Sequence, residues 1–274
     1  MGYNTKMKVA LVNFAEYEKF NSTVSFKQDL EFLVENKIDY VDYCFNYDKK
    51  LDLLAGFRKA LANPEIDLIW FVCGGNKTIK FLDDIDWEVV KKANKIYAGA
   101  SDFTHFSFKA VQNGQVCYYG TSLQEIKKYH PSPKSRKYLA DFLQTGKIEK
   151  YNHTNLYKTV SNLDEEKIVG GHTFLTTFML NEVKIDLRDR FLFLEHHYIP
   201  GESLEDLEYF VDQIKMVTKG NLPKGFIFGH SMLFGKKGKI MNVATINKKM
   251  VEWLREYDLP IAYIDHFKQI VKFS

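Results

Sequence analysis

Long apolar runs are absent from this sequence, and so is a strong excess of either charge. No stretch approaches the length of roughly 20 apolar residues that a membrane-spanning helix needs. The net charge is only +3, and the basic residues are spread among acidic ones rather than gathered in a stripe. We therefore expect neither a membrane nor a nucleic acid among the partners of this protein.

Cysteine is also scarce. The three cysteines, Cys44, Cys73 and Cys117, each fall in an apolar, strand-like run, and their spacing is not that of a metal site. An odd number of such residues indicates reduced thiols in the core. The apolar segment KVALVNFA near the N-terminus is too short for a signal peptide. Together these features predict a cytoplasmic protein.

Short apolar runs alternate with helix-period segments in the first part of the chain. KVALVNF, IDYVDYCF, DLIWFVC, KIYAGA and QVCYYG are typical of strands, and helical spacing separates them. This βαβ rhythm predicts an α/β fold, with a mostly parallel, doubly wound sheet over residues 1–125. Residues 126–157, with two prolines in PSP, are predicted as an exposed linker region. Residues 158–274 are predicted to form a second, smaller domain with a mixed sheet and helices.

Two sharp strand-to-loop transitions stand out in the first half. DLIWFVC runs directly into Gly74-Gly75-Asn76, and KIYAGA runs directly into Ser101-Asp102 and the apolar segment FTHFSFKAV. Glycines after a buried strand let another group approach the backbone closely. A serine between a strand and a helix start lies where backbone amides are unpaired, which suits a nucleophile beside an oxyanion site. The plainer interpretation of Ser101 is the N-cap of the helix that begins at Phe103.

A nucleotide cofactor is poorly supported by the same glycines. The dinucleotide pattern G-x-G-x-x-G is absent, and Asn76-Lys77-Thr78 resembles only the end of a P-loop, without its upstream glycine. A tight turn between strand and helix explains Gly74-Gly75 equally well. We therefore predict no cofactor.

Titratable residues close three apolar strands in the second half. Glu195 ends FLFLE, and a carboxylate at such a position pairs with a cation or orients a histidine. His196 and His197 follow it, but adjacent strand residues face opposite sides, so the three cannot converge on one ion and no metal site is predicted. His266 ends IAYIDH, and His230, which ends GFIFGH, is its competitor for a catalytic role.

In this order, these segments resemble the LD-carboxypeptidase family of serine peptidases, which includes the microcin-immunity peptidases. The resemblance covers about residues 50 to 266. It rests on Gly74-Gly75, FLDDIDW, Gly99-Ala100-Ser101-Asp102, FTHFSFKAV, YYGTSL, Gly170-Gly171-His172 and FLFLEHH.

The resemblance implies a Ser-His-Glu triad. Carried over by position, Ser101 is the nucleophile and Glu195 orients the histidine, while the amides of Gly75 and Asp102 form the oxyanion hole. Gly74 and Asn76 are carried over as substrate contacts.

The histidine departs from the family pattern. In Asp265-His266-Phe267-Lys268, strict register places Lys268 where the family has its histidine. His266 lies two residues earlier, and the alternation of a strand keeps both side chains on one face. We therefore expect His266 to be the base. His172 and His196 also replace the usual Asn and Asp.

The implied activity is hydrolysis of an amide bond in a small modified peptide. By resemblance, the substrate is a murein tetrapeptide cut between an L-centre and a terminal D-residue. A neighbouring alternative is an immunity-type hydrolase of a peptidyl-nucleotide antibiotic. Another is a catalytically degenerate protein that binds a peptide or a partner without turnover, which the displaced histidine motivates. The assembly we consider is a homodimer, a common state of soluble proteins.

Overall fold

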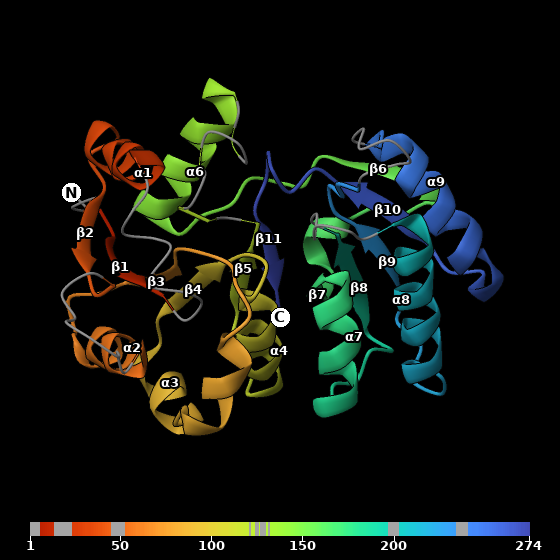
Figure 1. The fold of residues 1–274 in the computed structure, drawn as a ribbon, viewed down its shortest axis with the longest axis horizontal. Coiled ribbons are helices and arrows are strands. Elements are labelled where there is room, and N and C mark those ends of the chain that lie inside the picture. Colours follow the sequence, from red (N-terminus) through yellow and green to blue (C-terminus); the bar gives the residue numbers. More distant parts are fainter. Residues whose placement is uncertain are drawn as a thin grey trace.

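The computed structural model describes residues 6–13, 24–44, 53–120, 122–123, 126, 130, 132–196, 203–233 and 241–274. These residues form two β-sheets, one of six strands and one of five, and helices flank both (Figure 1). The predicted α/β architecture, with a mostly parallel first sheet and a smaller mixed second sheet, is confirmed. His197 lies outside the described residues.

The first sheet has the strand order β11-β5-β4-β3-β1-β2. All neighbouring strands are parallel except β5 and β11, which are antiparallel. A strand buried on both faces reads as a continuous apolar run, and LIWF of β3 is buried at every position. The strands are β1 (Lys8–Val12), β2 (Asp39–Asp42), β3 (Leu68–Phe71), β4 (Ile96–Gly99), β5 (Cys117–Tyr119) and β11 (Val271–Phe273).

Helices cover both faces of this sheet. Val9 and Leu11 of β1 pack in the same core cluster as α1 (Val24–Glu35) and α6 (Pro133–Thr145). Ala10 and Val12 point to the opposite face, as strand alternation requires. The helical elements that cover this opposite face are α2 (Leu53–Ala62), η1 (Thr78–Asp84), α3 (Trp87–Ala93) and α4 (Phe103–Gln112).

Helix α6 corrects one expectation, because part of the predicted exposed linker region is buried. Leu139, Phe142 and Leu143 of this helix are fully buried against the first sheet. Pro133, one of the two prolines that indicated a linker, lies at the helix start instead, and Pro131 lies outside the described residues. Ser132 and Ser135 form a capping box there, and Pro is well tolerated in the first turn.

The second sheet has the strand order β6-β10-β9-β8-β7. Strands β7 to β10 are parallel, and β6 lies antiparallel at the edge beside β10. No helix in the described ranges is long and apolar enough to cross a membrane. The elements are β6 (His153–Tyr157), η2 (Leu163–Glu165), β7 (Lys167–His172), α7 (Thr173–Glu182), β8 (Arg190–Glu195), α8 (Leu204–Val217), β9 (Gly225–Phe228), α9 (Val243–Leu254), η3 (Arg255–Tyr257) and β10 (Ile261–Ile264).

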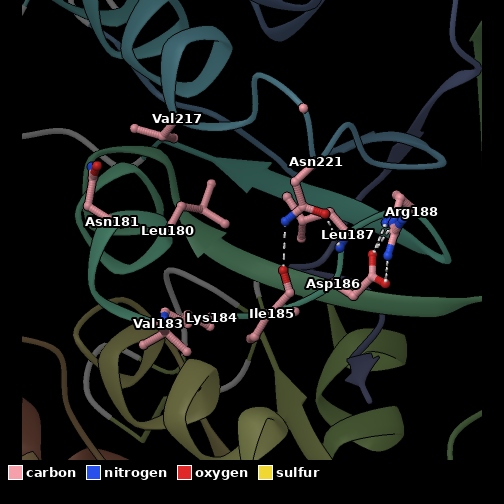
Figure 2. A pocket seen from close by; sticks show the side chains of 11 residues that line it. Leu180, Asn181, Val183, Lys184, Ile185, Asp186, Leu187, Arg188, Val217 and Asn221 are labelled. Atoms are coloured by element: carbon pink, nitrogen blue, oxygen red, sulfur yellow. Dashed lines mark hydrogen bonds and ion pairs between the residues drawn. The ribbon is translucent and has the colours of Figure 1, made fainter.

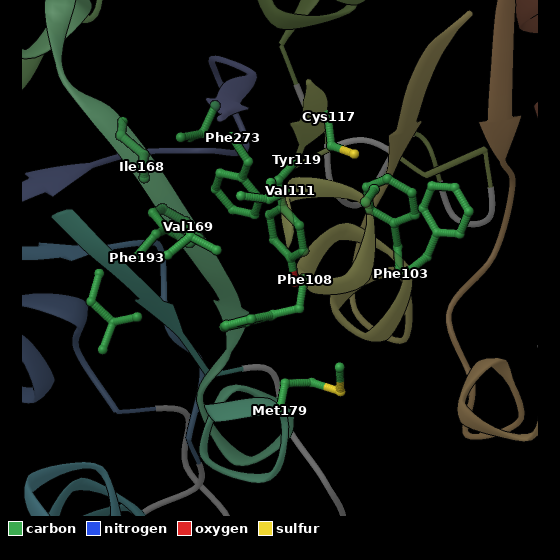
Figure 3. Close-up of a cluster of buried hydrophobic side chains, with 14 of the residues drawn as sticks. Phe103, Phe108, Val111, Cys117, Tyr119, Ile168, Val169, Met179, Phe193 and Phe273 are labelled. Carbon is green, nitrogen blue, oxygen red and sulfur yellow. The ribbon is translucent and has the colours of Figure 1, made fainter. Parts of the chain in front are cut away.

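The two halves share one hydrophobic core. After β10 the chain returns to the first sheet, where β11 pairs with β5. Strand β11, at the edge of the first sheet, and helix α4 face the second half of the chain (Figure 1). Phe108 and Tyr119 from the first half belong to one buried cluster with Met179 and Phe193 from the second half and with Phe273 of β11 (Figure 3). This core fixes the ends of the two sets of strands relative to each other.

Candidate active site

Ser101 occupies the turn between β4 and α4 in a backbone conformation that favours glycine. Its φ angle is +57°, in the left-handed region that few non-glycine residues adopt. Strained residues of this kind cluster at active sites. The N-cap of α4 is Asp102, not Ser101, so the plainer interpretation of the serine as a helix cap is wrong. The turn instead resembles the strand-to-helix elbow that exposes a nucleophile.

Gly74 lies directly against the serine. A Cβ atom at this position would be 2.9 Å from Cβ and 3.0 Å from Oγ of Ser101. A glycine is therefore required for the β3 loop to approach the serine this closely. The next residue, Gly75, has a φ angle of +157°. The structure thus brings the two predicted strand-to-loop transitions together.

The carboxylate of Asp102 binds the loop after Gly75 to the start of α4. Its Oδ2 accepts hydrogen bonds from the Lys77 amide at 3.1 Å, the Thr78 amide at 2.9 Å and the Thr78 hydroxyl at 2.7 Å. Its Oδ1 lies 2.9 Å from His105 Nδ1. Burial by itself raises the pKa of Asp102, but the hydrogen bonds from His105 and Thr78 outweigh it and hold the pKa below its usual value. Asp102 is therefore an ionised clamp within the core.

Tyr119 connects the serine to Glu195 across the two sheets. The Ser101 amide donates to the Tyr119 hydroxyl oxygen at 2.9 Å, and this hydroxyl donates to Glu195 Oε1 at 2.7 Å. Tyr119 ends β5 and Glu195 ends β8, and both are fully buried. Burial raises the pKa of Glu195 to about 8, although the Tyr119 hydrogen bond opposes the shift. Sequence reasoning missed Tyr119, because nothing in QVCYYG distinguishes it from Tyr118.

His266 is buried beside Glu195. A Cβ atom at Gly229 would be 2.7 Å from Cβ of Glu195 and 2.8 Å from Nδ1 of His266, so this glycine lets the two side chains flank one point of the backbone. The imidazole is 6.2 Å from the Tyr119 ring, centroid to centroid. Its Nδ1 accepts a hydrogen bond from the His230 amide at 2.9 Å, which places the proton of the neutral ring on Nε2. Burial lowers the pKa of His266 to about 3.

Lys268 and His230, the two alternatives to His266 in the sequence, are less buried than His266. Lys268, at the family's histidine register, has a side chain 66% exposed and pairs with Asp265 at 2.6 Å. The His230 ring is half-buried, stacks on Phe267 at 4.7 Å, and has its Nδ1 3.6 Å from Asp265. Of the three, His266 is the one packed against Tyr119 and Phe193.

Histidines also lie on the other side of Glu195. The rings of His172 and His196 are 5.0 Å apart, and both residues are buried. The amide of His196 donates to the Ser231 hydroxyl at 3.0 Å. Within the described ranges, no group of three or more His, Cys, Asp or Glu side chains is arranged to hold a metal ion.

A surface hollow lies at the opposite end of the second half. It is formed where α7 ends and β8 begins, and Asn221 spans it with hydrogen bonds to the Leu187 amide and the Ile185 carbonyl (Figure 2). Because α7 starts at the Glu195 end of the sheet and runs away from it, this hollow is remote from Ser101. None of the predicted catalytic residues lines it.

Comparisons with known proteins show what the first half is similar to. Residues 9–120 match the family described as the LD-carboxypeptidase N-terminal domain. The match includes the Gly74-Gly75 loop, the Ser101 turn and Tyr119, whereas Glu195 and His266 lie beyond it.

A curated relative extends the similarity. The chain is 28% identical over 171 residues to the probable murein peptide carboxypeptidase of Bacillus subtilis (strain 168). The aligned part is 61% of this chain and 52% of that protein, so it spans about half the length of the relative.

Solved structures share the fold over nearly the whole chain. The muramoyltetrapeptide carboxypeptidase of Oxalobacter formigenes has a TM-score of 0.74 and 18% identity, over 98% of this chain and 93% of that one. The microcin C7 self-immunity protein MccF, in complex with aspartyl sulfamoyl adenosine, has a TM-score of 0.74 and 15% identity, over 98% of this chain and 91% of that one. Both proteins therefore have the two-sheet architecture described above. The first half of the chain is thus similar to the LD-carboxypeptidase N-terminal domain, and the chain as a whole shares the fold of these two solved structures.

Proposed function

We propose that this protein is a serine carboxypeptidase-like hydrolase that cleaves an amide bond in a small modified peptide. The proposed substrate is a murein tetrapeptide, cut between its L-centre and the terminal D-residue. The observation that carries the proposal is the hydrogen-bonded chain from the Ser101 amide through Tyr119 to Glu195, with Ser101 in a strained turn. The functions named for the relatives agree with this chemistry.

Ser101 is the proposed nucleophile, and the amides of Gly75 and Asp102 are the proposed oxyanion hole. Such amides stabilise the negative oxygen that forms when the serine attacks a carbonyl carbon. The Asp102 clamp supports this role, because it joins the Gly75 loop to the Ser101 turn through Thr78 and Lys77. Gly74 and Asn76, which flank Gly75 in the same loop, are the proposed substrate contacts.

His266 is the proposed general base. Burial lowers its pKa to about 3, so the ring is neutral at pH 7, and it is a weaker base than an imidazole whose pKa lies near the operating pH. To take the Ser101 proton at Nε2, the ring must carry its own proton on Nδ1. The His230 amide now donates to that nitrogen, so this hydrogen bond has to open first. Glu195, on the other side of Gly229, is the side chain whose carboxyl oxygen is proposed to accept from Nδ1–H in the catalytic arrangement.

The same hydrogen bond favours a second candidate, a protein that binds a peptide without turnover. With the His230 amide donating to Nδ1, the imidazole lacks the proton placement of a working triad. In this alternative, the peptide binds beside Ser101, and the buried carboxyl group of Glu195 stabilises the site through Tyr119.

Product analysis separates these functions. Incubation with the murein tetrapeptide should release D-alanine, and Ser101→Ala should abolish the release. Ser107→Ala is the matched control, since Ser107 is a buried serine of α4 whose hydroxyl donates to the Thr104 carbonyl. Release of an aminoacyl-nucleotide from a peptidyl-nucleotide antibiotic, without D-alanine release, would assign the immunity-type activity. Binding of the tetrapeptide by calorimetry with no product would assign the binding protein.

The location and assembly form a further part of the proposal. We propose a cytoplasmic homodimer, and the buried thiols of Cys44, Cys73 and Cys117, none of which forms a disulfide among the described residues, agree with a reducing compartment. Phe174 and Phe178 on α7 are each 43% exposed, and apolar side chains of this kind are common in subunit interfaces. Sedimentation equilibrium should give twice the mass of the chain, and a Phe178→Glu variant should give the single mass.

A further inference from the structure

A groove runs along helix α9, separate from the residues of the candidate active site. Its volume is about 660 Å³, and it is lined by one face of α9, by the η3 residue Arg255, and by side chains of β6 and β10. Thr154 and Leu156 of β6 point into it, together with Tyr263 of β10. Because β6 is the edge strand of the second sheet, no further strand shields the outer side of this groove within the described residues.

A buried polar atom in the groove lacks a partner. Asn247 is 6% exposed and lines the groove, and its side-chain oxygen Oδ1 has no hydrogen-bond partner in the described part of the chain. Leaving a buried acceptor unsatisfied costs about 1–3 kcal/mol, and folded proteins rarely do so without a reason. A bound molecule with an N–H or O–H group would satisfy this atom.

The charge of the groove favours an anion. Lys248 and Arg255 line it together with one carboxylate, Glu252. That carboxylate pairs at 2.8 Å with Lys249, which does not line the groove. The two lining cations therefore exceed the negative charge that is free to oppose them. Leu156, Val251 and Tyr263 supply an apolar floor between the polar groups.

We propose that this groove is a second ligand site, which binds a small amphipathic acid. The apolar body of the ligand lies on Leu156, Val251 and Tyr263, an N–H group donates to Asn247 Oδ1, and the anionic group lies near Lys248 and Arg255. The Tyr263 hydroxyl is 3.4 Å from His230 Nδ1, and the His230 amide donates to His266. A ligand in the groove therefore contacts Tyr263, which is connected through His230 to the proposed base, His266.

The dye 8-anilinonaphthalene-1-sulfonate is a suitable probe, since it combines apolar rings, one N–H group and a sulfonate. The full chain should bind one dye per chain in a saturable fluorescence titration. Ala244→Trp, which places an indole in the groove from an exposed position on α9, should abolish this binding. Asn247→Leu should weaken it about tenfold while keeping or raising the melting temperature, because it removes an unsatisfied acceptor. A purely structural role of Asn247 would lower the melting temperature.

The control is Tyr209→Ala, which alters the exposed aromatic surface of α8, where a dye could also bind. Binding that survives both groove variants, or that is lost in Tyr209→Ala, would overturn the proposal. N-octanoylglycine should displace the dye, and its methyl ester, which lacks the charge, should do so at least tenfold more weakly. Equal displacement by the two compounds would refute the anion preference of the groove.

Discussion

At the scale of single residues, Tyr119 joins the two halves of the candidate site through one hydroxyl group. Tyr119→Phe leaves the Ser101 amide without its acceptor and Glu195 Oε1 without its donor, both in buried surroundings. We expect a loss of about 1–3 kcal/mol in the free energy of unfolding and a fall in hydrolysis of at least tenfold. Urea denaturation and D-alanine release would measure the two effects. Tyr118→Phe, at the neighbouring half-buried position, should change neither.

Glu195 makes the stability depend on pH in a defined direction. Its folded pKa of about 8 lies above the value of an unfolded carboxyl group, so the folded state binds the extra proton between about pH 4.5 and 8. The stability that Glu195 contributes is therefore present below this range and is lost as the pH rises through it, by a few kcal/mol in order of magnitude. Denaturation midpoints at pH 5 and pH 8 should show the fall, and Glu195→Gln should flatten it. If the stability of this variant falls with pH as steeply as that of the wild-type protein, the pH dependence does not come from Glu195.

Sequence reasoning found some of these residues and missed others for physical reasons. Ser101 and Glu195 were found because each stands at the end of an apolar strand, where a polar residue needs an explanation. Tyr119 was missed because Glu195, the acceptor of its hydroxyl group, comes from a strand 76 residues away in the sequence. Gly229 was missed because it follows β9 and makes space for side chains at the ends of β8 and β10, the strands on either side of β9.

At the scale of elements, the Asp102 clamp holds a loop of one strand against the helix of the next. Asp102→Ala would leave two backbone amides and the Thr78 hydroxyl without an acceptor inside the protein. We expect the free energy of unfolding to fall by about 3 kcal/mol or more and the rate of hydrolysis to fall strongly.

A second aspartate provides the comparison for this clamp. Asp86→Ala removes an exposed carboxylate that accepts from two amides at the start of α3, and a cap of this kind is worth about 1 kcal/mol. Chemical denaturation of both variants measures the difference. If both variants lose the same free energy of unfolding, the burial of Asp102 adds nothing to the stability that its hydrogen bonds provide.

The elements themselves were largely predictable, and α6 shows where prediction failed. The βαβ rhythm gave the parallel sheet because buried strands and amphipathic helices have distinct periods. In α6, Pro133 and the basic residues suggested an exposed connection, although Leu139 and Leu143 have helical spacing. The burial of this face depends on the first sheet, which no local pattern reveals.

At the scale of the whole molecule, the shared core predicts that the two sheets unfold together. The ring of Phe193 in the second sheet packs on the rings of Tyr119 and of Phe273 in β11. The centroid-to-centroid distances are 5.6 Å and 5.7 Å, respectively. Phe193→Ala should cost about 3–5 kcal/mol and lower the midpoint of one transition without splitting it. Far-UV circular dichroism and tryptophan fluorescence should give coincident curves. Two separate transitions in the wild-type protein would show that the halves are independent.

The central claim is the proposal that Ser101 is the nucleophile of a serine hydrolase. Intact-mass spectrometry after treatment with a fluorophosphonate, followed by peptide mapping, tests this claim most directly. The account predicts a single adduct on Ser101, absent in Ser101→Ala and retained in Ser107→Ala. No adduct on Ser101, together with D-alanine release that persists in Ser101→Ala, would contradict it.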